Sequence, residues 1–182
     1  ACRHCHSAID ATLDMRRDLK LQPEQVERIE VHTYKLAVGS HDHTDIRGIS
    51  SAKLSTPYAV ALAIVRGSAG YADYNEDNLN DYWIKNLTRK IKVVEDESLT
   101  AQSPAVRGAR VTIYLKEGKE YEAPCLYPKG EPENPLTQEE LEGKCRGLAM
   151  YGGLSSAECE EVISEVKKEN FDLNKILRIC KI

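Results

Sequence analysis

Hydrophobic residues recur with a helical period near the start of the chain. Cys5, Ile9 and Leu13 are spaced by four positions, so residues 5–19 are predicted to form a helix with one apolar stripe. Proline cannot continue a helix, and Pro23 therefore lies beyond its predicted end. The first element is an amphipathic helix with one face directed at a core.

The next segment alternates between apolar and polar residues. Within residues 26–37, Ile29 and Val31 share one face and Glu30 lies on the other, which is the period of a half-buried strand. Residues 39–51 are polar and follow neither period. We expect them to form the longest loop of the N-terminal part.

A helix start follows this stretch. Ser55 can cap the free N–H groups of a first turn, and Pro57 loses no hydrogen bond there. Residues 58–65 are almost entirely apolar, which predicts a helix buried on most sides. A second, more polar helix is predicted over residues 76–90.

The remaining pattern predicts strands and then helices. Residues 91–94 form a short predicted strand, and residues 106–127 alternate on both sides of a turn at Gly118, as in a hairpin. Two capping boxes then begin at Thr137 and at Ser155, and each predicts a helix.

The order of these elements predicts an α+β fold, with a small mixed or antiparallel sheet packed by helices and with C-terminal helices. We place an α+β domain at residues 1–136 and a helical segment at residues 137–182. The 25 Lys and Arg against 29 Asp and Glu give a net charge of −4. Residues 131–182 carry all of it, which supports a separate acidic tail.

Composition then excludes several classes of protein. The charge argues against nucleic acid as a partner, and no apolar run approaches the roughly 18 residues of a membrane span. The start at Ala1 shows no secretory leader and no Met, so we expect a cytoplasmic protein and a fragment of a longer chain. We expect the six cysteines to be reduced thiols, because a chain of this length needs no disulfide framework.

The densest group of reactive side chains is residues 2–6, Cys-Arg-His-Cys-His. These residues match C-x-x-C-H, the haem-attachment pattern, but such a protein needs export and a distal ligand, and Met15 and Met150 are the only methionines. Zinc held by Cys2, Cys5 and two further thiols is another alternative, although no second C-x-x-C completes it.

Helix geometry offers a third interpretation. His6 and Asp10 are four residues apart, so the carboxylate could orient the imidazole and raise its basicity. Arg3 and His4 lie one turn earlier. Together these groups suit the binding of a carboxylate substrate and the movement of a proton. The alternative is a terminus with ordinary solvated histidines, which composition alone favours.

Tyr58 is a second candidate, because the positive end of its helix can stabilise a phenolate and lower a pKa of about 10. A core tyrosine whose hydroxyl reaches the surface is the alternative. Lys53 and Ser55 could contact an anionic substrate, or could be a solvated charge and a helix cap.

Two further patterns concern cofactors. His41, His43 and Asp45 alternate as in some metal sites, but a solvent-exposed loop without fixed further ligands is the simpler interpretation. The chain has no G-x-S-x-G elbow, phosphate loop or G-x-G-x-x-G turn, so nucleotide cofactors are not expected.

Residues 2–10, CRHCHSAID, resemble the C-R-H-x-H-x-A-I-D signature of the MmgE/PrpD family. The resemblance continues through residues 51–61, SAKLSTPYAVA, and through the hairpin followed by Pro-Lys-Gly at 128–130. It covers roughly residues 2–145. The order of these segments makes the resemblance fairly specific.

The resemblance implies the C-terminal lid domain of a cofactor-free, metal-free lyase or isomerase of small di- or tricarboxylates, such as 2-methylcitrate dehydratase of propionate metabolism, cis-aconitate decarboxylase or iminodisuccinate epimerase. Its partners would be the substrate and an N-terminal helical domain of the same parent chain, which would be a homodimer. The implied residues are His6, Tyr58 and His4 for catalysis, and Arg3, with Lys53 and Ser55, for substrate binding. A non-catalytic binding module is the alternative.

Overall fold

The structure is a computed structural model that describes residues 1–180. It divides into two compact units, Ala1–Asn134 and Pro135–Ile182, and the fold is α+β. No helix in the described part of the chain is both long and apolar enough to cross a membrane.

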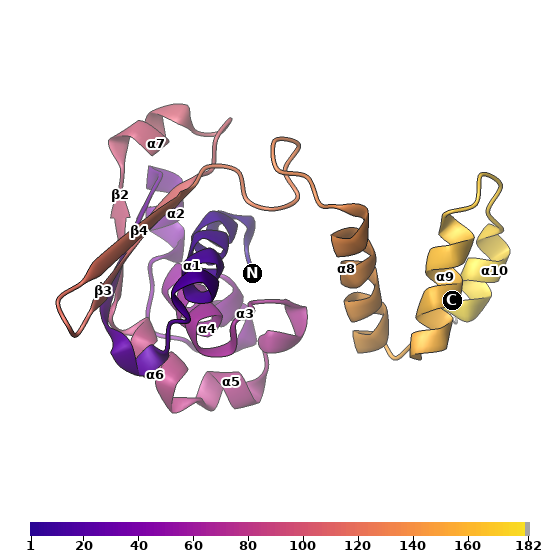
Figure 1. Ribbon diagram of the computed structural model, residues 1–182, viewed down its shortest axis with the longest axis horizontal. Coiled ribbons are helices and arrows are strands. Elements are labelled where there is room, and N and C mark those ends of the chain that lie inside the picture. Colours follow the sequence, from indigo (N-terminus) through magenta and orange to yellow (C-terminus); the bar gives the residue numbers. More distant parts are fainter. Residues whose placement is uncertain (181–182) are drawn as a thin grey trace. The chain divides into compact units, whose positions relative to one another are not determined.

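One four-stranded sheet forms the centre of the N-terminal unit (Figure 1). Its strands are β1 (Val26–Thr33), β2 (Ile91–Glu95), β3 (Ala109–Leu115) and β4 (Glu120–Cys125), in the order β2-β1-β3-β4. The pair β1 and β2 is parallel, whereas β3 is antiparallel to both of its neighbours. The sheet is therefore mixed, and β3 with β4 forms the predicted hairpin.

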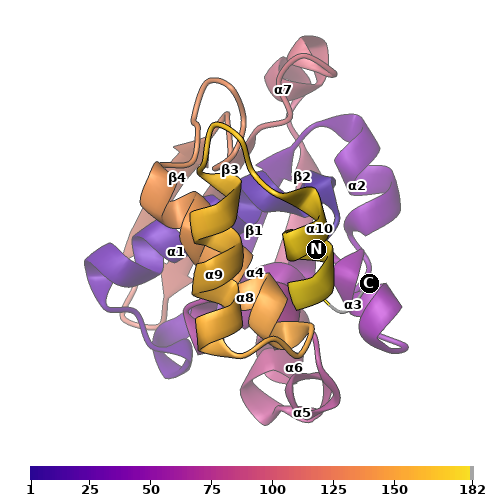
Figure 2. The same ribbon diagram turned by 90° about the vertical axis from the view of Figure 1, so that its right-hand side faces the viewer.

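Two helices cover one face of this sheet (Figures 1 and 2). Helix α1 (His6–Leu19) packs on β3 and β4, and α4 (Thr56–Arg66) packs on α1 and β2. The alternation predicted for β1 is confirmed, since Ile29 and Val31 are buried beneath these helices. The opposite face carries polar contacts such as the Arg28 to Glu30 ion pair.

Helix α4 forms where the sequence predicts it. The Ser55 hydroxyl accepts a hydrogen bond from the Tyr58 N–H at 3.1 Å, and Pro57 lies in the first turn. Gly67 ends the helix with a φ of 72°, a conformation that glycine adopts without strain. Every residue from Thr56 to Ile64 is buried, as the uniformly apolar pattern predicts.

The loop predicted over residues 39–51 is shorter in the structure, because helices occupy both of its ends. Strand β1 ends at Thr33, and α2 (Lys35–His41) and α3 (Ile49–Lys53) occupy the edges of the segment. Helix α2 forms because Ala37 packs with Tyr34 and Leu99 in a small apolar cluster. This burial is a tertiary contact that the local polarity does not indicate.

The predicted helix over residues 76–90 is divided into α5 (Glu76–Asn80) and α6 (Tyr82–Thr88). Asp81 lies between them with extended backbone angles, and its side chain caps α6 by accepting from the N–H groups of Trp83 and Ile84. The remaining unpredicted elements of the N-terminal unit are short: η1 (Arg3–Cys5), η2 (Pro23–Gln25), η3 (Tyr71–Asp73) and α7 (Glu97–Gln102).

The C-terminal unit is helical. Its helices are α8 (Gln138–Tyr151), α9 (Ser156–Val166) and α10 (Leu173–Ile179). Both capping boxes are confirmed at Thr137 and Ser155. Helix α10 was not predicted, and the buried Glu165 carboxylate supports its start by accepting from the Asp172 N–H at 3.1 Å.

Candidate functional site

The candidate site begins with the anchoring of residues 2–6 to the start of α4. The Cys2 N–H donates to the Lys53 carbonyl at 2.7 Å, which ties η1 to the end of α3. Cys5 is 0% exposed, and its sulfur accepts from the Thr56 hydroxyl at 3.4 Å. Burial raises the pKa of Cys5 to about 11, so its thiol is protonated and serves as a packing group.

Arg3 is held by a residue far along the chain. Its Nε donates to Glu131 Oε1 at 2.8 Å, and Nη2 bonds to the same oxygen. The remaining nitrogen, Nη1, is buried and has no hydrogen-bond partner in the structure. Arg3 therefore has the Nη1 amino group left for an anionic group, in a guanidinium whose orientation Glu131 fixes.

His4 lies against two aromatic side chains. Its Nδ1 is hydrogen-bonded to the Tyr34 hydroxyl, and the centroids of the His4 and His41 rings are 4.7 Å apart. Burial lowers the pKa of His4, and the nearby His41, Arg107 and Arg3 lower it further. The imidazole is therefore neutral at pH 7, the form that can accept a proton.

The surroundings of His6 differ from those that the sequence predicts. Its Nε2 lies 3.3 Å from the Ala1 carbonyl, whereas the Asp10 carboxylate accepts from the Lys129 N–H at 2.7 Å. Asp10 favours protonation of His6, but burial is the largest effect and lowers the pKa of His6. Asp10 therefore acts in the predicted direction, but desolvation outweighs it, and the pKa of His6 is lowered overall.

Tyr58 is 2% exposed, and its hydroxyl is buried without a hydrogen-bond partner. Burial raises its pKa to about 12, so the predicted lowering by the helix end is wrong. The phenol lies at a cavity of about 140 Å³ that Lys85 and Arg89 also line. The ring of Tyr74 is 6.0 Å away, between centroids. Tyr58 thus keeps its proton and has a free donor.

Lys53 and Ser55 differ in what they offer a ligand. The Lys53 ammonium lies 4.7 Å from the centroid of the Tyr71 ring, a cation–π contact at a partly exposed position. The Ser55 hydroxyl donates to the His43 carbonyl at 2.6 Å and caps α4. Ser55 is fully buried, and a substrate contact would require this arrangement to open.

Comparison with known families now decides the classification. The model of the MmgE/PrpD C-terminal domain matches residues 1–169. The chain belongs to the MmgE/PrpD family. A search of curated proteins found no match.

The MmgE/PrpD match includes all the residues that the sequence proposed for the site, and the structure arranges them in two groups. Arg3, His4 and His6 lie together around the start of α1, whereas Tyr58 faces its own cavity. The family is known for lyases and isomerases. On this MmgE/PrpD domain, Arg3 lies close enough to each of the two imidazoles for its charge to lower their pKa values.

His41 was missed as a neighbour of the signature. The prediction that His41, His43 and Asp45 lie in a solvent-exposed loop is wrong for His41, which is 6% exposed at the end of α2. His43 instead bonds to Ser51, and Asp45 pairs with Arg47 at 2.7 Å. No sequence signal within this segment indicates that His41 would meet His4.

Proposed function

We propose that this chain is the C-terminal domain of an MmgE/PrpD-type lyase or isomerase that acts on a small di- or tricarboxylate by cofactor-free acid/base catalysis. The observation that carries the proposal is the grouping of Arg3, His4 and His6 at the start of α1, with both imidazoles kept neutral. The rest of the enzyme would be an N-terminal helical domain of the same parent chain, in a cytoplasmic homodimer.

Arg3 is the proposed substrate-binding residue. Its unpartnered Nη1 can donate to a substrate carboxylate, and the Glu131 pair keeps the guanidinium in position. Lys53 is a second cation for a substrate with several carboxylates. Ser55 remains a weaker proposal, since its hydroxyl already has two partners within the chain.

His6 and His4 are the proposed bases. A neutral imidazole can accept a proton alpha to a carboxylate, and the guanidinium of Arg3 offsets the negative charge that develops on the substrate. Tyr58 is the proposed acid, because its phenol is protonated and its hydroxyl has no partner. A base and an acid of this kind serve dehydration, decarboxylation or epimerisation.

The test is turnover of 2-methylcitrate, cis-aconitate and iminodisuccinate by the full protein. We expect one of them to react, and His6→Gln and Tyr58→Phe to lower kcat by about 100-fold or more. Tyr74→Phe is the matched control, because its hydroxyl is also buried and unpartnered beside Tyr58. We expect this variant to keep its activity.

Two results would overturn the proposal. If none of the three compounds reacts while the protein still binds them, the binding-module alternative holds. If one reacts and the His6 and Tyr58 variants match the unaltered enzyme, the site assignment is wrong. Thermal unfolding of each variant separates a lost chemical group from a lost fold.

A further inference from the structure

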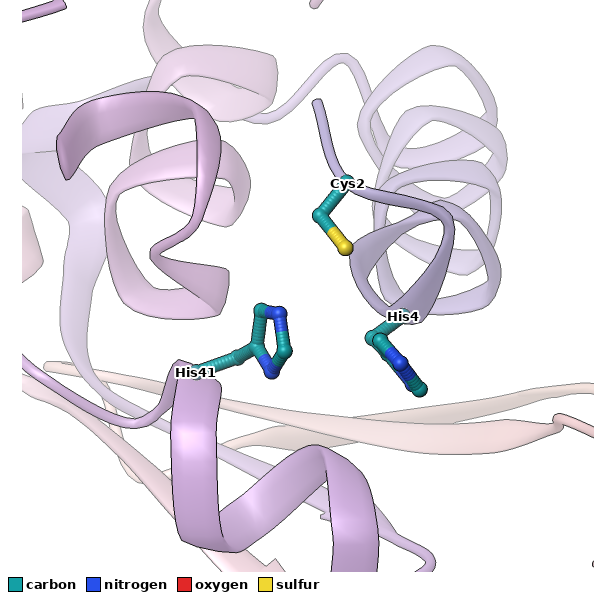
Figure 3. A group of neighbouring side chains, drawn as sticks. All are labelled: Cys2, His4 and His41. Atoms are coloured by element: carbon teal, nitrogen blue, oxygen red, sulfur yellow. The ribbon is translucent and has the colours of Figure 1, made fainter. Parts of the chain in front are cut away.

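Three metal-binding side chains converge beside the signature (Figure 3). They are Cys2, just before η1, His4 within η1, and His41 at the end of α2. One ligand atom from each side chain lies within 4.8 Å of the other two. This group differs from both metal sites considered from the sequence. Cys5 contacts Thr56 instead of joining Cys2, and His43 bonds to Ser51 instead of joining His41.

The His41 imidazole is aimed into this group. Its side chain is buried at the end of α2. Figure 3 shows Nε2 of His41 on the side of Cys2, and Nδ1, the nitrogen bonded to Cγ, turned toward α2. Nε2 is therefore the nitrogen of His41 that can coordinate an ion shared with Cys2 and His4.

His4 is already oriented as metal-binding histidines are. Its Nδ1 bonds to the Tyr34 hydroxyl, and when the phenol oxygen accepts this bond the lone pair is placed on Nε2. Histidine ligands of metals almost always carry such an outer partner, which fixes the tautomer and the plane of the ring. Tyr34 is buried, so the orientation is well supported.

We propose that Cys2, His4 and His41 form a three-ligand Zn²⁺ site with water as the fourth ligand. One sulfur and two imidazole nitrogens are a donor set that zinc uses when it keeps an open position. Ligand atoms of one tetrahedral zinc lie about 3.5 Å apart, so a separation of up to 4.8 Å closes with small side-chain rotations.

The local charges are compatible with a cation. Binding converts the Cys2 thiol to a thiolate and releases its proton to solvent, which adds one negative charge at the site. Arg3, the nearest fixed positive charge in the sequence, is paired with Glu131. Arg107 is exposed, so solvent screens its effect on the ion.

This site has a regulatory consequence that rests on the proposed function. Zinc bound to His4 would occupy the lone pair that accepts a proton, so the ion would inhibit the enzyme. The same imidazole would serve either the metal or the substrate, but not both.

The test is titration of the 182-residue chain with Zn²⁺ under reducing conditions, read by competition with a chromophoric chelator, and with Co²⁺ as a spectroscopic probe. We expect one equivalent to bind and Co²⁺ to show a thiolate charge-transfer band. Cys2→Ser and His41→Gln should weaken binding about tenfold or more. Cys145→Ser, which alters a thiol of the C-terminal unit, is the matched control and should bind as the unaltered chain does.

An acetylated N-terminus is the second control, because the Ala1 amine lies close enough to Cys2 for their charges to interact. The acetylated chain should still bind one equivalent of Zn²⁺ and show the cobalt band, because the amine is not one of the three proposed ligands. The proposal is overturned if Cys2→Ser binds as tightly as the unaltered chain, or if the cobalt band is absent. Circular dichroism shows whether the His41→Gln variant folds. If that variant does not fold, the Cys2→Ser variant alone tests the proposal, because Cys2 is more exposed than His41. The metal titration needs no turnover, so it can succeed or fail independently of the proposed reaction.

Discussion

At the scale of single residues, burial decides the protonation of the candidate site. The sequence suggested that Asp10 raises the basicity of His6 and that a helix end acidifies Tyr58. In the structure, desolvation is the largest effect on both groups and acts in the opposite direction. Loss of hydration removes stabilisation from whichever form is charged, so the imidazole loses its proton more readily and the phenol keeps its own.

The pKa of His4 provides a test of this balance. Arg107→Gln removes a positive charge that disfavours the protonated imidazole, so the pKa of His4 is expected to rise toward its ordinary value. An NMR titration of the histidine ring protons measures the change. Arg17→Gln, on the exposed side of α1, is the control and should leave His4 unaffected. A pKa of His4 that does not change in Arg107→Gln would refute this contribution.

At the scale of elements, the helix caps explain what local sequence predicts well. The Ser55 cap, the two capping boxes of the C-terminal unit and the turn at Gly118 are all present. Each depends on residues within four positions of one another. Helix α2 and the break at Asp81 were not predicted, because they depend on packing and on backbone angles that periodicity does not describe.

The N-terminal cap of α4, Ser55, should make a measurable contribution to the free energy of unfolding. Ser55→Ala removes the cap of α4 and leaves the His43 carbonyl without its 2.6 Å donor, so the free energy of unfolding should fall by about 2 kcal/mol. Urea unfolding followed by the fluorescence of Trp83 measures this change, because Trp83 lies in α6, which packs on α4. The exposed Ser68→Ala is the control. Equal midpoints for both variants would show that the cap contributes nothing.

At the scale of the whole molecule, two units form with separate cores. The sheet and its covering helices make one apolar cluster, and α8 to α10 make contacts among themselves. Residues 1–134 alone are therefore expected to fold and to unfold cooperatively in urea. Trp83, the single tryptophan, reports only on this unit. If residues 1–134 show no cooperative transition, the core of this unit is not sufficient for folding.

The sequence by itself determined the α+β class, the positions of most elements and the MmgE/PrpD membership, because periodicity, caps and signatures are local patterns of side chains. It also pointed to residues 2–6 as the chemically dense segment. Only the tertiary structure decided that His41 and Tyr34 meet His4, and that Glu131 holds Arg3. Such contacts join residues 30 to 128 positions apart, so no local pattern describes them. Burial in the folded chain also raises the pKa of Tyr58 and outweighs the effect of Asp10 on His6.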